Sequence, residues 1–263
     1  MKLWLVDRLV EEEAARISPF DRGFTLGDGL FETLRLAGGA VLRLDAHLAR
    51  LAAGAGVLGI PLPALDLGAA LVVTAQANQL ADGVLRLTLT RGVGPRGVLP
   101  PAVPTPTLVI TAAPAGPALP PARLVIAQTT RRNARSPLAQ VKSLNYLDGI
   151  LARQEAARRG ADDAVLLNTE DRVAETTIAN VFAVIDGALV TPPVADGALP
   201  GVMRAAVLSE GAEARPLDAF DLAQADEIFL TSALGIRSVS AIEGRALSVF
   251  TAAARLRARI AGA

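Results

Sequence analysis

The chain has 263 residues, of which 51% are hydrophobic and 20% are charged, and its formal net charge is zero. This length allows one large domain or two of ordinary size, with enough apolar residues for a substantial core. No basic patch with interleaved aromatic residues is present, which argues against nucleic-acid binding. The chain has no cysteine and a single histidine, His47, so Cys-ligated zinc, thiolate catalysis and a multi-histidine metal site are excluded within one chain.

Nothing in the sequence indicates export or a membrane. The apolar part of residues 1–7 is too short for a signal peptide. The longest apolar stretches are interrupted by charge, glycine or proline well before the length of a membrane span. We therefore expect a cytoplasmic protein that binds no membrane, no nucleic acid and no metal.

The first half of the chain predicts short strands, turns and two helices. An alternating apolar run over residues 30–36 predicts a strand, followed by a hairpin turn at Gly38 and Gly39. Asp45 is a candidate N-cap for a helix over about 46–54, and a second helix is expected over about 64–78. Further strands are expected over residues 3–6, 84–91 and 108–111.

Residues 112–121 are rich in proline and carry no charge, which predicts a stiff linker. We expect an N-terminal domain over 1–111 and a C-terminal domain over 122–263. In the second half, a helix is expected over about 144–159, with Leu147, Ile150, Leu151 and Gln154 on one face. Strands are expected over 123–127, 164–168, 172–175, 180–185, 188–191 and 227–230, with helices over 201–212 and 250–260. The chain is therefore expected to be a mixed α/β protein (α+β) of two unlike halves.

Only two of the 26 cationic side chains are lysines, Lys2 near the terminus and Lys142 in an apolar stretch. Arginine replaces lysine in salt bridges and phosphate contacts, but not as an amine that loses its proton and attacks a carbonyl. Lys142 is therefore a candidate for a covalent bond to a carbonyl compound. A chance survivor of a drift from lysine to arginine is the alternative.

An aldehyde cofactor bound through lysine needs an amine, anion donors for a phosphate, a partner for the ring nitrogen and a wall for the ring face. Arginine and the amides at a helix N-terminus are typical phosphate donors. Four segments supply candidates for these groups: 21–32, 47–51, 142–147, and 175–182 with 199–204. Together they resemble the class IV pyridoxal-phosphate enzymes of fold type IV, which include branched-chain and D-amino acid aminotransferases and 4-amino-4-deoxychorismate lyases.

The resemblance implies a two-domain fold with pyridoxal 5′-phosphate in the interdomain cleft, and a homodimer in which the neighbouring subunit completes the substrate pocket. It makes Lys142 the Schiff-base lysine, which also moves the substrate proton. Glu175, 33 positions later, matches the glutamate that faces the pyridine nitrogen. Arg50 matches the phosphate-binding arginine, and His47, one helical turn earlier, is expected to be structural. Each could instead be an ordinary surface residue.

The resemblance assigns further cofactor contacts. The backbone amides of Val202 and Met203 match those that bind the phosphate at a helix N-terminus. Ser232 matches a second phosphate loop, with a plain strand-end serine as the alternative. Tyr146 resembles the tyrosine near the phenolic oxygen of the cofactor, with a packed helix tyrosine as the alternative. Asn180 lies near the ring in such folds, with a plain strand-start residue as the alternative.

Two features resemble the lyases: the Arg-Gly-rich loop over residues 90–97, and Met203 together with Ala233 and Leu234. D-amino acid aminotransferases have a similar loop but carry a histidine where this chain has Val98. The segment 142–145 is close to their lysine motif. The sequence therefore carries features of both the lyases and the D-amino acid aminotransferases.

The leading hypothesis is a 4-amino-4-deoxychorismate lyase that gives 4-aminobenzoate and pyruvate, and the alternative is a class IV aminotransferase for D- or branched-chain amino acids. A non-catalytic binding protein on the same fold is a third reading. Arg91 or Arg96 could hold a substrate carboxylate, or could only stabilise the loop. Thr33 is a candidate for a polar contact near the leaving pyruvate. Phe24, Leu26 and Phe31 are expected near the pocket or the subunit interface.

Overall fold

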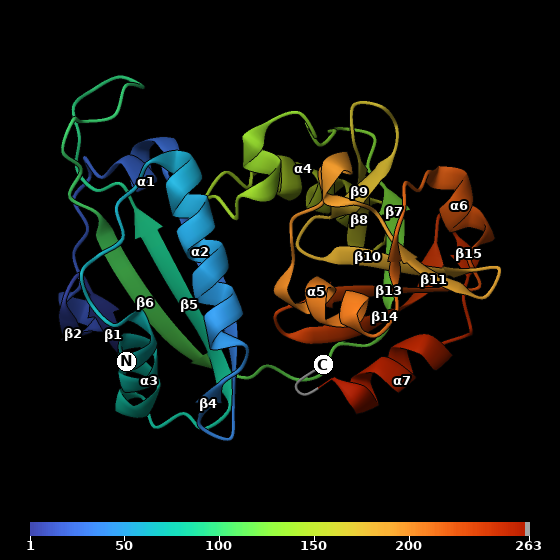
Figure 1. Ribbon diagram of the computed structural model, residues 1–263, viewed down its shortest axis with the longest axis horizontal. Helices are drawn as coiled ribbons and strands as arrows, with labels where there is room; N and C mark the ends of the chain where they lie inside the picture. The colour runs from blue at the N-terminus through green and yellow to red at the C-terminus, as the bar shows by residue number, and fades with distance from the viewer. Residues whose placement is uncertain (261–263) are drawn as a thin grey trace. The chain divides into compact units, whose positions relative to one another are not determined.

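A computed structural model describes residues 1–260, which form two compact units (Figure 1). The first unit contains residues 1–116 together with 141–145. The second contains residues 117–140 and the chain from residue 146 onward. Each unit is built on its own sheet with helices packed against it, which confirms the expected mixed α/β fold.

The break between the two units, after Gly116, falls inside the expected linker 112–121. Strand β6 (Thr107–Pro114) runs through the first three residues of the segment 112–121, because they pair with β5 (Gly83–Thr90). Residues 141–145 group with the first unit although they follow that segment in the chain. The expected C-terminal domain ends in residues 261–263, which lie outside the described part of the chain.

The first unit contains a six-stranded antiparallel sheet in the order β2-β1-β6-β5-β3-β4. Its other strands are β1 (Lys2–Leu5), β2 (Arg8–Glu11), β3 (Gly29–Ala37) and β4 (Ala40–Val41). Its helices are α1 (Arg22–Leu26), α2 (Leu44–Leu58) and α3 (Leu67–Ala77), with a 3₁₀ turn η1 (Glu12–Ala14).

One face of this sheet carries the core of the unit. Leu34 on β3, Leu87 on β5 and Ile110 on β6 are fully buried there, and Leu51 of α2 and Leu71 of α3 belong to the same cluster (Figure 1). Side chains alternate across a strand, so the intervening residues of β3 and β5 lie on the opposite face of the sheet. That second face carries Phe31 and Thr33, whereas Arg50 belongs to α2, the helix that packs on the core face.

The second unit contains a nine-stranded mixed sheet in the order β12-β11-β10-β13-β14-β7-β8-β9, with β15 paired to β14. Its strands are β7 (Ala122–Ile126), β8 (Asp163–Leu167), β9 (Val173–Thr176), β10 (Asn180–Ile185), β11 (Ala188–Thr191), β12 (Glu213–Ala214), β13 (Glu227–Ser232), β14 (Gly235–Ile242) and β15 (Arg245–Ala246). Its helices are α4 (Leu147–Arg158), α5 (Val202–Ser209), α6 (Ala219–Gln224) and α7 (Thr251–Arg259), with 3₁₀ turns η2 (Pro137–Gln140) and η3 (Val194–Asp196).

Stacked aromatic rings mark one core of this unit. Phe182 on β10 and Phe229 on β13 stack with ring centres 5.2 Å apart, and both pack in one cluster with Met203 of α5 and Leu256 of α7. Helix α5 is thereby fixed against the strands that also carry Asn180 and Ser232. The sequence correctly predicted β10 and β11 to the residue, but it did not predict β14.

Two expected helix starts differ from the structure. Asp45 is not the N-cap of α2, which begins at Leu44 after Arg43, whose φ is +53°. Asp45 lies instead in the first turn, where a carboxylate still interacts favourably with the helix dipole. Helix α4 begins at Leu147, since residues 142–144 pair with β3. Its residues Leu147, Ile150 and Leu151 are exposed.

Candidate active site

Lys142 lies in an extended segment that runs beside β3. Its carbonyl accepts a hydrogen bond from the amide of Phe31 (2.9 Å). The neighbouring side chains of Val141 and Ser143 are buried, and alternation along the segment directs Lys142 to the other side. There the Nζ atom lies 4.4 Å from the centre of the Phe31 ring. The amine is therefore held by backbone pairing and lies against an aromatic face.

A second cation shares the ring of Phe31. The Cζ atom of Arg86 lies 3.8 Å from the same ring centre. Arg86 on β5 is directly opposite Thr33 on β3, so Phe31, Thr33 and Arg86 share one face of the sheet. An amine, a hydroxyl and a guanidinium on one face suit an amino compound that carries a carboxylate.

Arg50 is oriented by a buried carboxylate on β3. Its Nε and Nη2 atoms donate to the two oxygens of Glu32 at 2.8 and 2.6 Å. Nδ1 of His47, which is also buried, lies 2.7 Å from Glu32 Oε2. Burial raises the pKa of Glu32, but hydrogen bonds from His47 and Arg50 outweigh it and the pKa is lowered. An ionised carboxylate can only accept, so Nδ1 carries the proton.

Arg91 is engaged by the protein itself. Its Nε and Nη2 atoms bind both oxygens of Asp28, and Nη1 and Nη2 also donate to the carbonyls of Gly59 and Leu58 at the end of α2. Arg91 is buried, whereas Arg96 is exposed. These contacts argue against Arg91 as the partner of a substrate carboxylate and leave Arg96 as the candidate from this loop.

Glu175 lies on β9 in the second unit, in a network of this unit's own groups. Its Oε1 atom pairs with Nη2 of Arg132 at 3.1 Å, and its Oε2 atom accepts from the amide of Leu199 at 3.0 Å. Arg132 also donates to the carbonyls of Gly197 and Ala139. The carboxylate is held at both oxygens, which fixes its direction.

The N-terminus of α5 is built for close approach. Gly201 is its N-cap, and a Cβ at this position would lie 2.0 Å from Asn180 Oδ1. Asn180 is buried and donates to the carbonyl of Leu199 at 2.9 Å. Because the cap has no side chain to accept from them, the amides of Val202 and Met203 are available to an anion. The Met203 side chain packs in the core of the unit.

The remaining candidates occupy strand and helix ends of the second unit. Ser232 ends β13, and its Oγ accepts from the amide of Leu234 at 3.2 Å. Ser232 pairs with Gly235, so Ala233 and Leu234 form a two-residue turn. Tyr146 occupies the N-cap position of α4 and is half-buried. Thr231 is buried, and its hydroxyl has no hydrogen-bond partner among the described residues.

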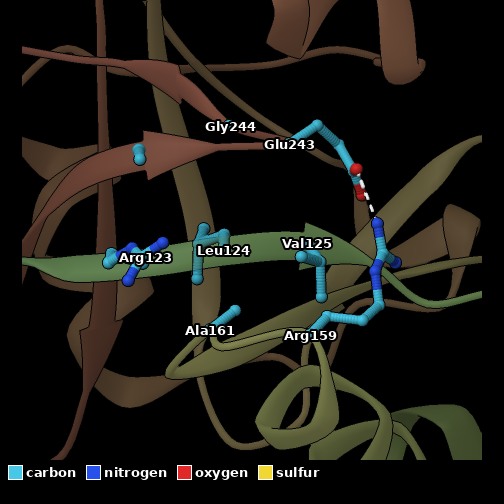
Figure 2. Close-up of a pocket in the computed structure, with 8 residues that line it drawn as sticks. Arg123, Leu124, Val125, Arg159, Ala161, Glu243 and Gly244 are labelled. Atoms are coloured by element: carbon cyan, nitrogen blue, oxygen red, sulfur yellow. Dashed lines mark hydrogen bonds and ion pairs between the residues drawn. The ribbon is translucent and has the colours of Figure 1, made fainter.

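A pocket of about 260 Å³ lies elsewhere in the second unit (Figure 2). It is formed by β7, the turn after β14 and the loop after α4, and an ion pair between Arg159 and Glu243 (2.7 Å) crosses one side. None of the candidate residues lines it. Among residues 1–260, no cluster of acidic and histidine side chains could hold a metal ion. No helix within these residues is long and apolar enough to cross a bilayer.

The sequence did not indicate Glu32, Arg86 or Arg132 as site residues. Arg86 alternates with leucines on β5, which predicts that it projects from the face opposite the core. Glu32 instead stands in register with Leu30 and Leu34 on β3, so it lies on the leucine-lined face. No such pattern marks Arg132, since only the folded chain brings its loop to Glu175.

The chain belongs to the class IV aminotransferase family, whose model matches residues 29–242. A protein of Methanocaldococcus jannaschii, provisionally named a branched-chain-amino-acid aminotransferase, is 38% identical over 94% of this chain and 90% of that protein. The structure of 4-amino-4-deoxychorismate lyase from Pseudomonas aeruginosa matches with a TM-score of 0.86 and 35% identity, over 98% of this chain and 97% of that one.

A third similar structure, the T.th. branched-chain amino acid aminotransferase solved with pyridoxamine 5′-phosphate, has a TM-score of 0.90 and 27% identity. The match covers 98% of this chain and 92% of the aminotransferase chain. These matches establish fold type IV, and the family is dependent on pyridoxal phosphate. The chain is therefore an enzyme of this class, a lyase or an aminotransferase.

Proposed function

We propose that this enzyme is a 4-amino-4-deoxychorismate lyase. The observation that carries the proposal is the side chain at the start of α5: Met203 is buried in the core and offers no hydroxyl, at a position where aminotransferase relatives commonly have threonine. The two-residue turn Ala233-Leu234 likewise resembles the lyases. The match to the Pseudomonas aeruginosa lyase, over 97% of that chain, supports the same reading.

The residues fit pyridoxal 5′-phosphate. Lys142 supplies the only amine in the chain besides Lys2 and the N-terminus, and we propose that it binds the cofactor covalently. Arg50 and the amides of Val202 and Met203 would hold the phosphate, with Ser232 as a further donor. When bound, the cofactor supplies an electron sink for the carbanion next to the amine.

Glu175 would face the pyridine nitrogen. Its carboxylate is directed by Arg132 and the Leu199 amide, so a proton on a ring nitrogen beside it would be stabilised. Asn180 is the first residue of β10 and lies against Gly201, the N-cap of α5. Tyr146 is the N-cap of α4, the helix that follows Lys142. We assign both to cofactor contacts on the strength of the family resemblance.

The side chains around Lys142 support the chemical step. The Lys142 amine, once released by the substrate amine, removes the proton from the amine-bearing carbon. The ether bond to the enolpyruvyl group would then break as the substrate ring becomes aromatic, giving 4-aminobenzoate. The enolpyruvate that leaves would take up a proton, such as the one held by Lys142, to become pyruvate. The Phe31 ring covers one side of the amine, and Arg86 and Arg96 are candidates for the substrate carboxylates. Thr33, opposite Arg86, is placed for a polar contact with the leaving pyruvate.

A branched-chain aminotransferase is the second candidate. The similarity to the Methanocaldococcus jannaschii protein, at 38% identity, favours it. The same lysine, glutamate and phosphate donors would serve, and the difference would lie in where Lys142 returns the proton. Incubation with 4-amino-4-deoxychorismate, and separately with D- and L-amino acids plus 2-oxoglutarate, tests the choice. Consumption of only an amino acid would refute the lyase.

We also propose a homodimer. Large apolar side chains are exposed on and around α1, including Phe20 and Phe24 at 69% and 77% exposure. Val98 and Leu99, next to Arg96, are exposed by more than 80%. A large exposed apolar surface of this kind typically faces a partner subunit. The neighbouring subunit would then cover the loop that carries Arg96.

A further inference from the structure

The guanidinium of Arg22 anchors the part of the loop that directly follows Arg96. Nη1 of Arg22 donates to the carbonyls of Gly97 (3.0 Å) and Leu99 (3.4 Å), and Nη2 donates to the carbonyl of Val98 (2.9 Å). Three consecutive carbonyls directly after Arg96 are therefore bound by one side chain. Only arginine has enough donors in a fixed geometry to do this.

The guanidinium of Arg22 is itself held in place by Asp28. Nε of Arg22 donates to Asp28 Oδ2 at 2.8 Å, and Arg91 holds both oxygens of the same carboxylate. Arg22 is 3% exposed. A charged group buried to this extent needs a paired and hydrogen-bonded partner, and Asp28 provides one. The Arg22 side chain therefore cannot move without breaking a buried ion pair.

The start of this loop, at Gly92 and Gly94, also contacts Arg22. The Arg22 amide donates to the carbonyl of Gly92 at 2.8 Å. Gly94 lies so close to the Arg22 stem that a Cβ there would be 2.6 Å from Cδ. Beyond these contacts, residues 95–100 are exposed. The position of Arg96 thus depends on Arg22 at both the start and the far side of the loop.

We infer that Arg22 is a positioning residue for substrate recognition: it holds residues 97–99 so that Arg96 is presented to the substrate carboxylate. The inference rests on the proposed function only for the role of Arg96. The ordering of the loop by Arg22 is independent of which amino substrate the enzyme uses. Asp28 and Arg91 act through Arg22 and α2, and we assign them no contact with substrate.

Trypsin cleavage after Arg96 measures the loop without any substrate, because a protease needs a locally opened chain. In the cofactor-loaded enzyme, Arg22→Met should raise the rate at which fragments 1–96 and 97–263 appear by about tenfold, the effect of losing about 1.4 kcal/mol from the closed loop. The KM for the accepted amino substrate should rise, while kcat and cofactor absorbance stay within about twofold.

Two further variants separate positioning from stability. Arg22→Lys keeps a cation beside Asp28 but cannot hold three carbonyls, so it should recover stability without restoring slow cleavage or the low KM. Arg153, which pairs with the buried Asp163 at 2.9 Å in the second unit, provides the control Arg153→Met. That variant should lose stability without faster cleavage after Arg96.

The inference would be overturned by wild-type cleavage in Arg22→Met, or by an equal increase in Arg153→Met. Faster cleavage with an unchanged KM would overturn the link to substrate. Faster cleavage in an enzyme that proves to be an aminotransferase would leave the ordering role of Arg22 intact while removing the lyase proposal.

Discussion

Arg50 on α2 and Glu32 on β3 form a two-point ion pair, with Nε–Oε1 at 2.8 Å and Nη2–Oε2 at 2.6 Å. Glu32 is 1% exposed, and its Oε2 atom is also bound by Nδ1 of His47. The helix and the strand are thus joined by a charged group whose second function, in our account, is to direct the Arg50 guanidinium toward a phosphate.

Glu32→Gln should therefore weaken binding of pyridoxal 5′-phosphate by about tenfold, or about 1.4 kcal/mol, because Arg50 loses its charged partner. Equilibrium dialysis of the apoenzyme measures this effect. Pyridoxal, which lacks the phosphate, is the matched ligand and should bind both proteins equally. An equal loss of affinity for pyridoxal would show that the change is a general disruption of the fold.

Glu175→Gln should keep the cofactor bound, since the phosphate contacts remain, but slow proton removal in a single turnover. Loss of a charged stabiliser of this kind costs about 10²-fold in rate. The control Glu170→Gln removes a half-exposed carboxylate that pairs with Arg172 (2.8 Å) at the surface. Single-turnover absorbance measures the rate, and equal rates in wild type and Glu175→Gln would contradict the assigned role.

Acid should destabilise the second unit through Glu155 of α4. Burial raises the pKa of Glu155, but hydrogen bonds from the Thr129 hydroxyl and from the amides of Thr129 and Gln128 outweigh it and lower the pKa from 4.5 to about 2. The unfolded chain then binds more protons than the folded one between these values. The stabilisation is fully present above pH 4.5 and is lost as the pH falls toward 2.

Urea unfolding at pH 6 and pH 3 checks this prediction. Glu155→Gln should be less stable than wild type at pH 6, and the difference should shrink at pH 3. Glu11→Gln, which removes an exposed carboxylate of β2, is the control and should follow the wild-type curve. A difference between Glu155→Gln and wild type that is constant with pH would show that the carboxylate's charge is not what stabilises the loop.

Arg86→Met should raise the KM for the amino substrate by about tenfold while leaving cofactor absorbance unchanged, because its proposed partner is a substrate carboxylate. The KM of Arg86→Lys should fall between those of wild type and Arg86→Met, since lysine keeps the charge but lacks the planar guanidinium. Steady-state kinetics provide the test. A loss of cofactor binding in Arg86→Met, with KM unaffected, would place Arg86 at the cofactor instead.

Sedimentation of the cofactor-loaded enzyme across a dilution series should show an active dimer. Phe24→Asp should shift it to an inactive monomer, because the charge would be buried in the proposed interface. Phe220 on α6 is 71% exposed, and Phe220→Asp is the matched control that should remain a dimer. A fully active wild-type monomer would refute both the dimer and a pocket completed by a neighbouring subunit.

Much of the fold follows from local pattern. Alternating leucines predicted β3 and β5, and the pair Gly38-Gly39 predicted the turn between β3 and β4, because period and turn chemistry are properties of neighbouring residues. The pairing of residues 142–144 with β3 was not predictable in this way. It joins segments more than a hundred positions apart, and it shortens α4 by displacing its start to Leu147.

The candidate site shows the same division. The rarity of lysine pointed to Lys142, and the resemblance to the family pointed to Glu175 and Arg50. The partners of these residues, Glu32 and Arg132, depend on which side chains the folded strands and loops bring together. Arg91 was one of two candidates for a substrate carboxylate, with a role in stabilising the loop as the alternative. It is bound by Asp28 and by carbonyls at the end of α2, contacts that no local pattern indicates.

Turnover without an acceptor tests the central claim most directly. A lyase needs no second substrate, whereas an aminotransferase stops after converting one equivalent of its cofactor. Incubation of the cofactor-loaded enzyme with excess 4-amino-4-deoxychorismate and no keto acid should yield 4-aminobenzoate and pyruvate in equal amounts, many times the amount of enzyme, and Lys142→Ala should yield neither. No pyruvate from that substrate, together with repeated amino transfer from an amino acid to 2-oxoglutarate, would contradict the account.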